Sequence, residues 1–530
     1  MPSSGNYHLP EVRACDVAKP PSLWTALPLR LVMSTKDAAA LTMMRHELLG
    51  LSTAVLSAVL MLGTAPASAQ SMTEALASAY ATNPDLAADI ANLKAVNEGV
   101  AQALSGYRPQ ISADASIESQ FSNTTSDAVP ATGLVSQLQP SGKRGDPLSS
   151  GGREGYWHEV NPATLGITIT QNIYNGGQTE AAVNQAENTV MATRAVVQTT
   201  EQTVLLDAAT AYADVVQNQA ALDVQRNNEA VLRRQLQATQ DRFNVGEVTR
   251  TDVSQAEASL ASAVAGRVEA EGTLRASRAT FERFIGQPPG TLETPAVPVG
   301  LPSSMQDAIQ RAQANYPGIV AAVFTERAAA DNIDLQFGAL LPSIDVQARI
   351  QRQYSTISHP QTSSGAQSRV DSAAIVAQVT IPLYSQGNQE SLVRQARYTH
   401  GQRRIQIESQ RRTAIQGAVQ SWQALVTARA SIKSFQAAVK AEQLAVEGLQ
   451  QEAQVGSRTV LDVLTEQQNL LNAQLSLVQA RRNEVVAGYQ LRNAVGTLTA
   501  QDMGLPVKIY DPEPDYQKTR ARWWGTSIDE

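Results

Sequence analysis

The chain contains two copies of one unit, and this duplication limits what it can fold into more than any other feature of the sequence. Pro84, which follows an asparagine, has its counterpart in Pro317, 233 residues further on. Pro109 and Pro342 lie at the same offset, and each of these two prolines precedes an alternating apolar segment. A repeated sequence predicts a repeated supersecondary unit, so both copies are expected to contain one succession of elements.

The offset between the two copies is shorter further along the chain. Tyr174 and Tyr384 lie 210 residues apart, and so do Gly246 and Gly456. The difference between the two offsets, 23 residues, belongs to the first copy alone. Because the Gly-, Ser- and Pro-rich stretch 141–155 lies in the affected part of the first copy, we interpret the additional residues as a surface-loop insertion.

Each copy predicts two short helices separated at a proline, then a pair of strands, then two long helices. The short helices are expected at about 71–82, 84–106, 304–315 and 317–339. The strands alternate with period two, which predicts one apolar and one polar face. In the third strand the apolar positions are Ile344, Val346, Ala348 and Ile350.

The long helical segments show a seven-residue repeat of apolar residues. In the first copy these positions are Val183, Val190, Val197, Val204 and Ala211. Sustained heptads predict coiled-coil packing, and about 65 residues at about 1.5 Å each make a helix of about 100 Å. The first repeat is therefore expected at 70–300, with strands at about 109–174 and long helices at about 178–285. The second repeat is expected at 301–500, with strands at about 342–384 and long helices at about 386–497, and a C-terminal tail follows at 501–530.

A targeting segment precedes the first repeat. The apolar run 48–62 follows a basic start and leads to an Ala-x-Ala ending at Ala69, so residues 43–69 are interpreted as a signal peptide. Residues 1–42 are interpreted as a non-native or disordered N-terminal extension upstream of the true start. The candidate start residues are Met33, Met43 and Met44.

The composition argues against several classes of function. The net charge is −7, and basic residues do not cluster with aromatic residues, so nucleic-acid binding is not expected. The single cysteine, Cys15, allows no intrachain disulfide, and the five histidines form no metal-ligating pair. No convergent nucleophile, base or metal ligands are visible. We therefore expect no enzyme activity and no cofactor.

The four amphipathic strands predict an oligomer if they cross a membrane. After residue 70 no apolar run is long enough for a spanning helix. Four strands cannot close a barrel, and unpaired edges are not tolerated in a bilayer. Two chains would supply eight strands and three would supply twelve, and only the larger barrel would leave a lumen. These arguments leave both the dimer and the trimer open.

Four segments resemble the TolC family of outer-membrane efflux and type I secretion channels. They are residues 242–246, 383–387, 455–464 and 494–498, and the resemblance covers about 72–500. It implies an α+β membrane protein, a homotrimer whose 12-stranded outer-membrane β-barrel continues into a long periplasmic coiled-coil α-helical barrel. It also implies an exit duct in the outer membrane, with most of its mass in the periplasm and outer-membrane lipid around the strands.

The resemblance implies two protein partners besides the chain itself. They are a periplasmic adaptor (membrane fusion) protein and an inner-membrane pump of the ABC, RND or a similar class. A different class also uses heptads and membrane strands, namely a coiled-coil surface adhesin or structural envelope protein. Such a protein usually has one strand block at a terminus, whereas strand pairs recur inside both repeats here.

The turns between the long helices are the candidate functional site. The resemblance implies exposed helix tips that meet the adaptor, at Val245, Gly246, Glu247, Val455, Gly456 and Ser457. It implies a periplasmic gate in which Asp252 bonds a neighbouring helix, Arg458 latches the moving helix pair and Asp462 forms an acidic ring in the lumen. Simple turn chemistry, capping boxes at Asp252 and Asp462, and an i,i+4 pair of Arg458 with Asp462 are the structural alternatives.

The gate departs from the family pattern in two places. Ala453 stands where a tyrosine is expected, so the bond from that tyrosine to the Asp252 region is absent. Thr465 stands where a second ring aspartate is expected, and Glu466 follows one turn beyond Asp462. We expect a gate that is held less firmly, or by polar groups such as Gln451 and Gln454, with Glu466 in place of the second aspartate.

Overall fold

The computed structural model describes residues 70–126, 154–358 and 366–528. All of them fall within one unit, Ala69–Glu530. Three expectations lie wholly or mostly outside the described residues: the extension at 1–42, the signal peptide at 43–69 and the insertion at 141–155.

Each repeat opens with two short helices that meet at a proline. They are α2 (Met72–Thr82) and α3 (Pro84–Leu104) in the first repeat and α6 (Met305–Asn315) and α7 (Pro317–Gly338) in the second. A proline can begin a helix because the first N–H groups of a helix have no partner within it. The side chain of Asn83 caps α3 by accepting a hydrogen bond from Asp85 N at 2.8 Å.

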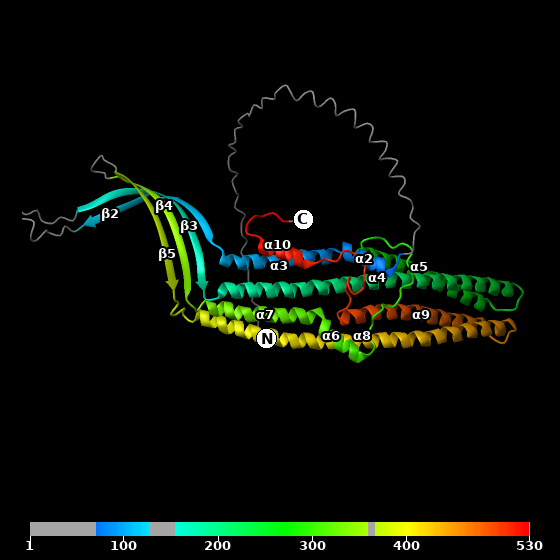
Figure 1. Ribbon diagram of the computed structural model, residues 1–530. Helices are drawn as coiled ribbons and strands as arrows, with labels where there is room; N and C mark the ends of the chain where they lie inside the picture. Colours follow the sequence, from blue (N-terminus) through cyan, green and yellow to red (C-terminus); the bar gives the residue numbers. More distant parts are fainter. Residues whose placement is uncertain (1–69, 127–153, 359–365, 529–530) are drawn as a thin grey trace, which may run out of the picture. The chain divides into compact units, whose positions relative to one another are not determined.

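The strands form one antiparallel sheet that joins the two repeats (Figure 1). Its strands are β1 (Gln110–Ile117), β2 (Gln120–Ser126), β3 (Glu154–Asn175), β4 (Ser343–Ser358) and β5 (Ala366–Thr380). The order is β1-β3-β4-β5, and β2 also pairs with β3. The pairing of β3 with β4 connects the first repeat to the second. In the described parts of the chain, β1, β2 and β5 each have one edge without a strand partner.

The first predicted strand is interrupted and not continuous. Gln110 pairs with Thr170, and Gln120 pairs with Val160, so the register across the break between β1 and β2 is unchanged. At the break Glu118 N donates to Pro162 O over 2.9 Å. In register the sheet therefore has four strand positions, as the alternation predicts.

The alternation places apolar residues in rows across one face of the sheet. One such row consists of Ile111, Ile169, Ala348 and Ile375. The adjacent row consists of Ser112, Thr168, Arg349 and Ala374, and it lies on the opposite face. Ile375 is 81% exposed, so the apolar face has no covering layer within the described residues.

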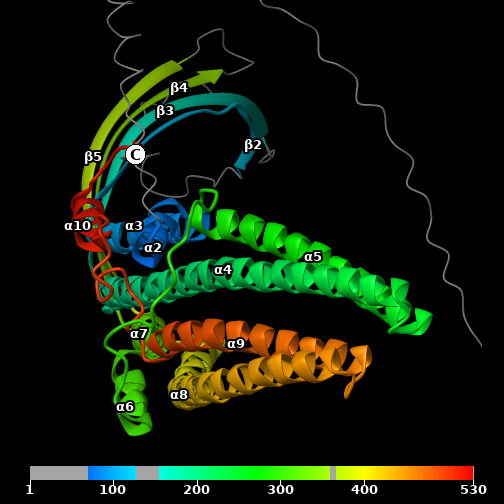
Figure 2. The same ribbon diagram turned by 90° about the vertical axis from the view of Figure 1, so that its right-hand side faces the viewer.

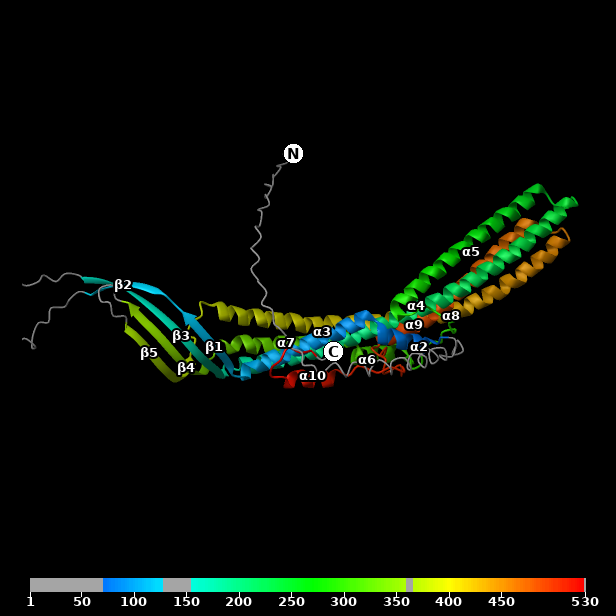
Figure 3. The same ribbon diagram turned by 90° about the horizontal axis from the view of Figure 1, so that it is seen from above.

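The long helices form two hairpins, α4 (Gln178–Asn244) with α5 (Arg250–Ile285) and α8 (Asn388–Gln454) with α9 (Val460–Ala494). The two hairpins lie side by side, joined by contacts of α4 with α9 (Figures 2 and 3). α4 and α8 both have 67 residues, as the 210-residue offset predicts. Among the described residues no helix is both long and apolar enough to cross a membrane.

A buried core joins α2 and α9 to the first hairpin, α4 with α5. It contains residues from α2, α4, α5 and α9 and from the chain after α9. Tyr212 at its centre lies 6.2 Å from Phe281, measured between ring centroids. The Tyr212 hydroxyl donates to Gln70 O at 2.7 Å or to Glu293 O at 2.9 Å, and burial raises the pKa of Tyr212 to about 12. The heptad residue Val204 belongs to this core.

The C-terminal tail contains a helix that the sequence analysis missed, α10 (Pro512–Ala521). Asp511 caps it by accepting from Glu513 N at 3.0 Å, and Pro512 occupies its first position. This cap and proline are a recognisable helix start, so the signal was present in the sequence. α10 packs against α3.

Candidate functional site at the helix tips

The two hairpins end in turns of the same geometry. Gly246 and Gly456 both have φ of +82°, a conformation in which glycine avoids the strain of other residues. Glu247 N donates to Arg242 O at 2.9 Å. In the same way Ser457 N donates to Glu452 O, at 3.0 Å. Val245 and Val455 precede the two glycines and are 72% and 81% exposed.

A capping box begins the helix after each turn. Thr249 N donates to Asp252 Oδ2 at 2.8 Å, and Asp252 N donates to Thr249 Oγ1 at 3.3 Å. Thr459 and Asp462 repeat these bonds at 3.0 and 3.2 Å. The bond from Thr459 N lowers the pKa of Asp462, so this carboxylate is charged at neutral pH. Both aspartates therefore have a structural role in the chain itself.

The i,i+4 pair of Arg458 with Asp462 is wrong as an account of these residues. Arg458 Nε lies 3.1 Å from Glu452 Oε2, across the turn. Because α9 begins at Val460, Arg458 lies before the helix and the i,i+4 geometry does not apply. The first tip contains an equivalent bond between Arg242 Nε and Glu247 Oε2, also of 3.1 Å.

The two departures from the family pattern have defined contacts. Thr465 Oγ1 donates to Leu461 O at 2.8 Å, one turn back on α9. Glu466 accepts from Asn469 Nδ2 at 3.2 Å and faces Glu442 of α8. A hydrogen bond with the side chain of Glu466 raises the pKa of Glu442.

An apolar cluster joins the two hairpins close to the tips. Val460 and Leu464 of α9 are buried against the first hairpin. The buried residues they meet there are Leu232, Ala256 and Ala263. This cluster, which we call the tip joint, was not identified from the sequence. Leu464 belongs to the heptad series that continues to Leu471 and Val485, so this periodicity was the available signal in the sequence.

The gate remains a prediction. Asp252 and Asp462 each bond the threonine that caps their own helix, Thr249 and Thr459. Ala453 is buried at the end of α8. Among the described residues, no group of three or more His, Cys, Asp or Glu side chains could hold a metal ion.

The fold is shared with a class of solved structures, that of bacterial outer-membrane channels. The solved structure of VceC from Vibrio cholerae superposes with a TM-score of 0.62 at 21% identity and covers 80% of this chain and 96% of that chain. The CmeC channel of Campylobacter jejuni superposes with a TM-score of 0.65 at 15% identity, covering 85% and 89%.

The sequence assigns the chain to a family within this class. The family model described as outer membrane efflux protein matches residues 75–287 and 308–497. The outer membrane efflux protein BepC of Brucella suis biovar 1 (strain 1330) is 34% identical over 475 residues, 89% of this chain and 96% of the relative. The chain therefore belongs to the outer membrane efflux protein family, the predicted resemblance is confirmed, and the protein is located in the outer membrane.

Proposed function

We propose that three copies of this chain form an outer-membrane exit duct for tripartite efflux or type I secretion. Their sheets join into one 12-stranded β-barrel, and their long helices continue it as a tunnel in the periplasm. An adhesin or structural envelope protein is disfavoured by the family to which the chain belongs.

The main support for this proposal is the structure of the sheet. Among the residues that the structure describes, nothing covers its apolar face, and β1 and β5 have no strand partner on their outer edges, which leaves backbone N–H and C=O groups there. In a bilayer each unpaired group costs several kcal/mol, so copies of the chain must pair β1 with β5 of the next copy. Three copies supply twelve strands, which leave a lumen, whereas two supply only eight.

The periplasmic tips form the proposed gate. Three Asp462 carboxylates around one axis would make an acidic ring that attracts cations, and three Glu466 side chains would add charge one turn further along. Arg458, which bonds Glu452 within its own turn, would latch the second hairpin in the closed state by bonding a neighbouring hairpin of the trimer. Thr465, bonded to its own helix, contributes no charge to this ring.

The exposed turns are the proposed adaptor-docking surface. Val245, Gly246 and Glu247 form one tip, and Val455, Gly456 and Ser457 form the other. The two valines present apolar surface at the ends of the hairpins. A helical hairpin of an adaptor, connected to an inner-membrane pump, would pack between neighbouring tips.

Crosslinking between β1 and β5 tests the number of copies. Ala113→Cys is combined in turn with Ala373→Cys, Ile375→Cys and Ala377→Cys, because the register between copies is to be found by the scan. All four positions are on the apolar face. One combination is expected to give a covalent species of three chains on denaturing gels, since ring closure joins every copy to two others.

Ser112→Cys with the same β5 variants is the matched control, because its side chain lies on the opposite face. Covalent dimers or tetramers as the largest species, from chains that fractionate with the outer membrane, would contradict the trimer.

Conductance measurements test the gate separately. Arg458→Ala is expected to raise the single-channel conductance of purified trimers, because it removes the basic group of the proposed latch. Asp462→Asn is expected to weaken block by trivalent cations. Unchanged conductance and unchanged block would contradict the proposed gate but not the proposed exit duct.

A further inference from the structure

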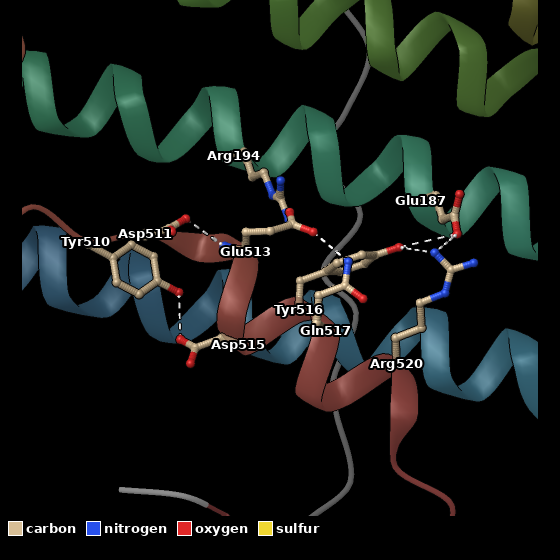
Figure 4. A network of polar contacts seen from close by, with 9 residues as sticks. All are labelled: Glu187, Arg194, Tyr510, Asp511, Glu513, Asp515, Tyr516, Gln517 and Arg520. Carbon is tan, nitrogen blue, oxygen red and sulfur yellow. Dashed lines mark hydrogen bonds and ion pairs between the residues drawn. The ribbon is translucent and has the colours of Figure 1, made fainter.

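The C-terminal helix α10 is fixed to α4 by ionic and aromatic contacts (Figure 4). Glu513 Oε2 lies 3.0 Å from Arg194 Nη2, and Arg520 Nη1 lies 3.1 Å from Glu187 Oε1. Between these pairs the ring of Tyr516 lies 5.3 Å from the Arg194 guanidinium. These contacts hold both ends of α10, so the residues after it start from a defined place.

Tyr516 also belongs to an apolar cluster beneath α10. It is 7% exposed and packs with Leu93 and Val100 of α3 and Val190 of α4. Burial raises the pKa of Tyr516. Aromatic burial of this kind contributes about 3 kcal/mol or more to a contact, which is enough to keep a short helix attached.

Arg108 holds the segment after α10 at the base of the sheet. Its Nη1 donates to Arg522 O at 3.0 Å, and its guanidinium lies 4.7 Å from the centre of the Trp523 ring. Arg108 is separated from Gln110, the first residue of β1, by a single proline. Trp523 is therefore held at the level where the helices end and the strands begin.

Trp523 and Trp524 nevertheless remain 70% and 91% exposed. Other exposed aromatic residues lie at the same ends of the strands: Tyr107 before β1, Tyr174 at the end of β3 and Tyr384 after β5. Tyr174 pairs with Ile344, which places it on the apolar face. Tryptophan and tyrosine are enriched where a bilayer meets water, because one end of each ring is apolar and the other is polar.

The other boundary of the apolar face is charged. Arg352, Arg369 and Asp371 lie on this face near the far ends of β4 and β5, and Arg352 Nε lies 2.6 Å from Asp371 Oδ1. Ile344 and Arg352 are eight residues apart, or about 27 Å along the strand and about 20 Å across a membrane at the usual strand tilt. The apolar bands of outer-membrane proteins are about 25 Å tall, so the aromatic residues lie at the periplasmic boundary.

We infer that Trp523 and Trp524 bind the phospholipid headgroup region of the periplasmic leaflet, as an anchor supplied by the C-terminal tail. The inference rests on the proposed membrane orientation of the sheet. We assign lipid as the partner of Trp523 and Trp524 because these two residues continue the aromatic boundary of the apolar face. The α8 helix of a second copy and an adaptor protein are alternative occupants that the experiment distinguishes.

Site-specific labelling tests the inference in the full-length protein. In a Cys15→Ser background, Trp524→Cys and, separately, Thr526→Cys are labelled with an NBD fluorophore. The second variant keeps both tryptophans. The labelled protein is reconstituted in phosphatidylcholine–phosphatidylglycerol vesicles that contain lipids with a nitroxide at the headgroup or deep in the acyl chain. Gln501→Cys, on an exposed position of the loop after α9, is the aqueous control, and Ile375→Cys on β5 is the acyl-chain control.

Labels at both tail positions are expected to be quenched at least twofold more by the headgroup nitroxide than by the deep one. Quenching of the tail labels equal to that of Gln501→Cys would overturn the inference. Blue-shifted emission without lipid quenching would overturn it in favour of a protein occupant. An unquenched label at Ile375 would instead contradict the proposed barrel, so the two failures are distinguishable.

Discussion

At the scale of single residues, the two tips share their backbone and differ in the direction of their charges. In the first tip the cation, Arg242, is on the helix and the anion is in the turn. In the second tip Glu452 is on the helix and the cation, Arg458, is in the turn. Exposed pairs of this kind stabilise a turn by at most about 1 kcal/mol. Their main effect is therefore to give the two tips different surfaces for a partner.

The carboxyl pair of Glu442 and Glu466 predicts a pH effect at the second tip. The pKa of Glu442 is raised by its hydrogen bond with Glu466, so Glu442 holds its proton more tightly in the folded state than in the unfolded state. The stabilisation is present at low pH and is lost as pH rises through the raised pKa. Lowering the pH from about 7 through the raised pKa of Glu442 is therefore expected to slow amide hydrogen exchange in residues 460–470, after correction for intrinsic rates.

Glu442→Gln should remove this pH dependence, because the amide cannot titrate. The lowered pKa of Asp462 acts in the opposite direction only at more acidic pH, where its cap is lost. An equal pH dependence in Glu442→Gln and in the unmodified protein would contradict the assignment.

At the scale of elements, the tip joint is the apolar contact that holds the second hairpin against the first close to the tips. Leu464→Ala removes a buried side chain from it, and such a change costs about 2–5 kcal/mol in a packed core. We expect faster hydrogen exchange at the start of α9 and a higher single-channel conductance. Leu444→Ala on α8, where the leucine is 71% exposed, is the matched control and is expected to change neither.

The attachment of α10 depends on one aromatic side chain. Tyr516→Ala removes the ring that packs with Leu93 and lies beside Arg194, so α10 is expected to detach. Limited trypsin digestion followed by mass spectrometry should then show rapid cleavage at Lys518 and Arg520. Tyr516→Phe keeps the ring and loses only the hydroxyl bonds with Glu187 and Arg520, so it should remain nearly as resistant as the unmodified protein.

At the scale of the whole molecule, the two faces of the sheet are expected to tolerate charge very differently. Ile375→Arg puts a cation on the apolar face, at a cost of about 2–4 kcal/mol near the middle of a bilayer. Val376→Arg puts the same cation on the opposite face. The first variant should lower the amount of heat-resistant oligomer in outer-membrane fractions, and the second should not. Equal loss from both would contradict a lipid-facing apolar row.

The sequence was sufficient for the features that repeat. Pro84 and Pro317 marked the same helix start, and Gly246 and Gly456 the same turn, because each fixes a local backbone conformation. The partner of Arg458 could not be predicted from the sequence, because the choice of Glu452 over Asp462 depends on which residue begins α9. The docking of α10 depends on contacts with residues more than 300 positions away, such as Glu187, and no local pattern specifies them.

The equal length of α4 and α8 has a consequence for how the gene can change. One residue added to a helix turns everything beyond it by about 100° and moves it by about 1.5 Å. In the proposed trimer six tips must end level, so a single insertion in α4 would leave three of them misaligned with their neighbours. Length changes in the two helices are viable only in step, whereas the 23 additional residues of the first copy, between its strands, disturb no such alignment.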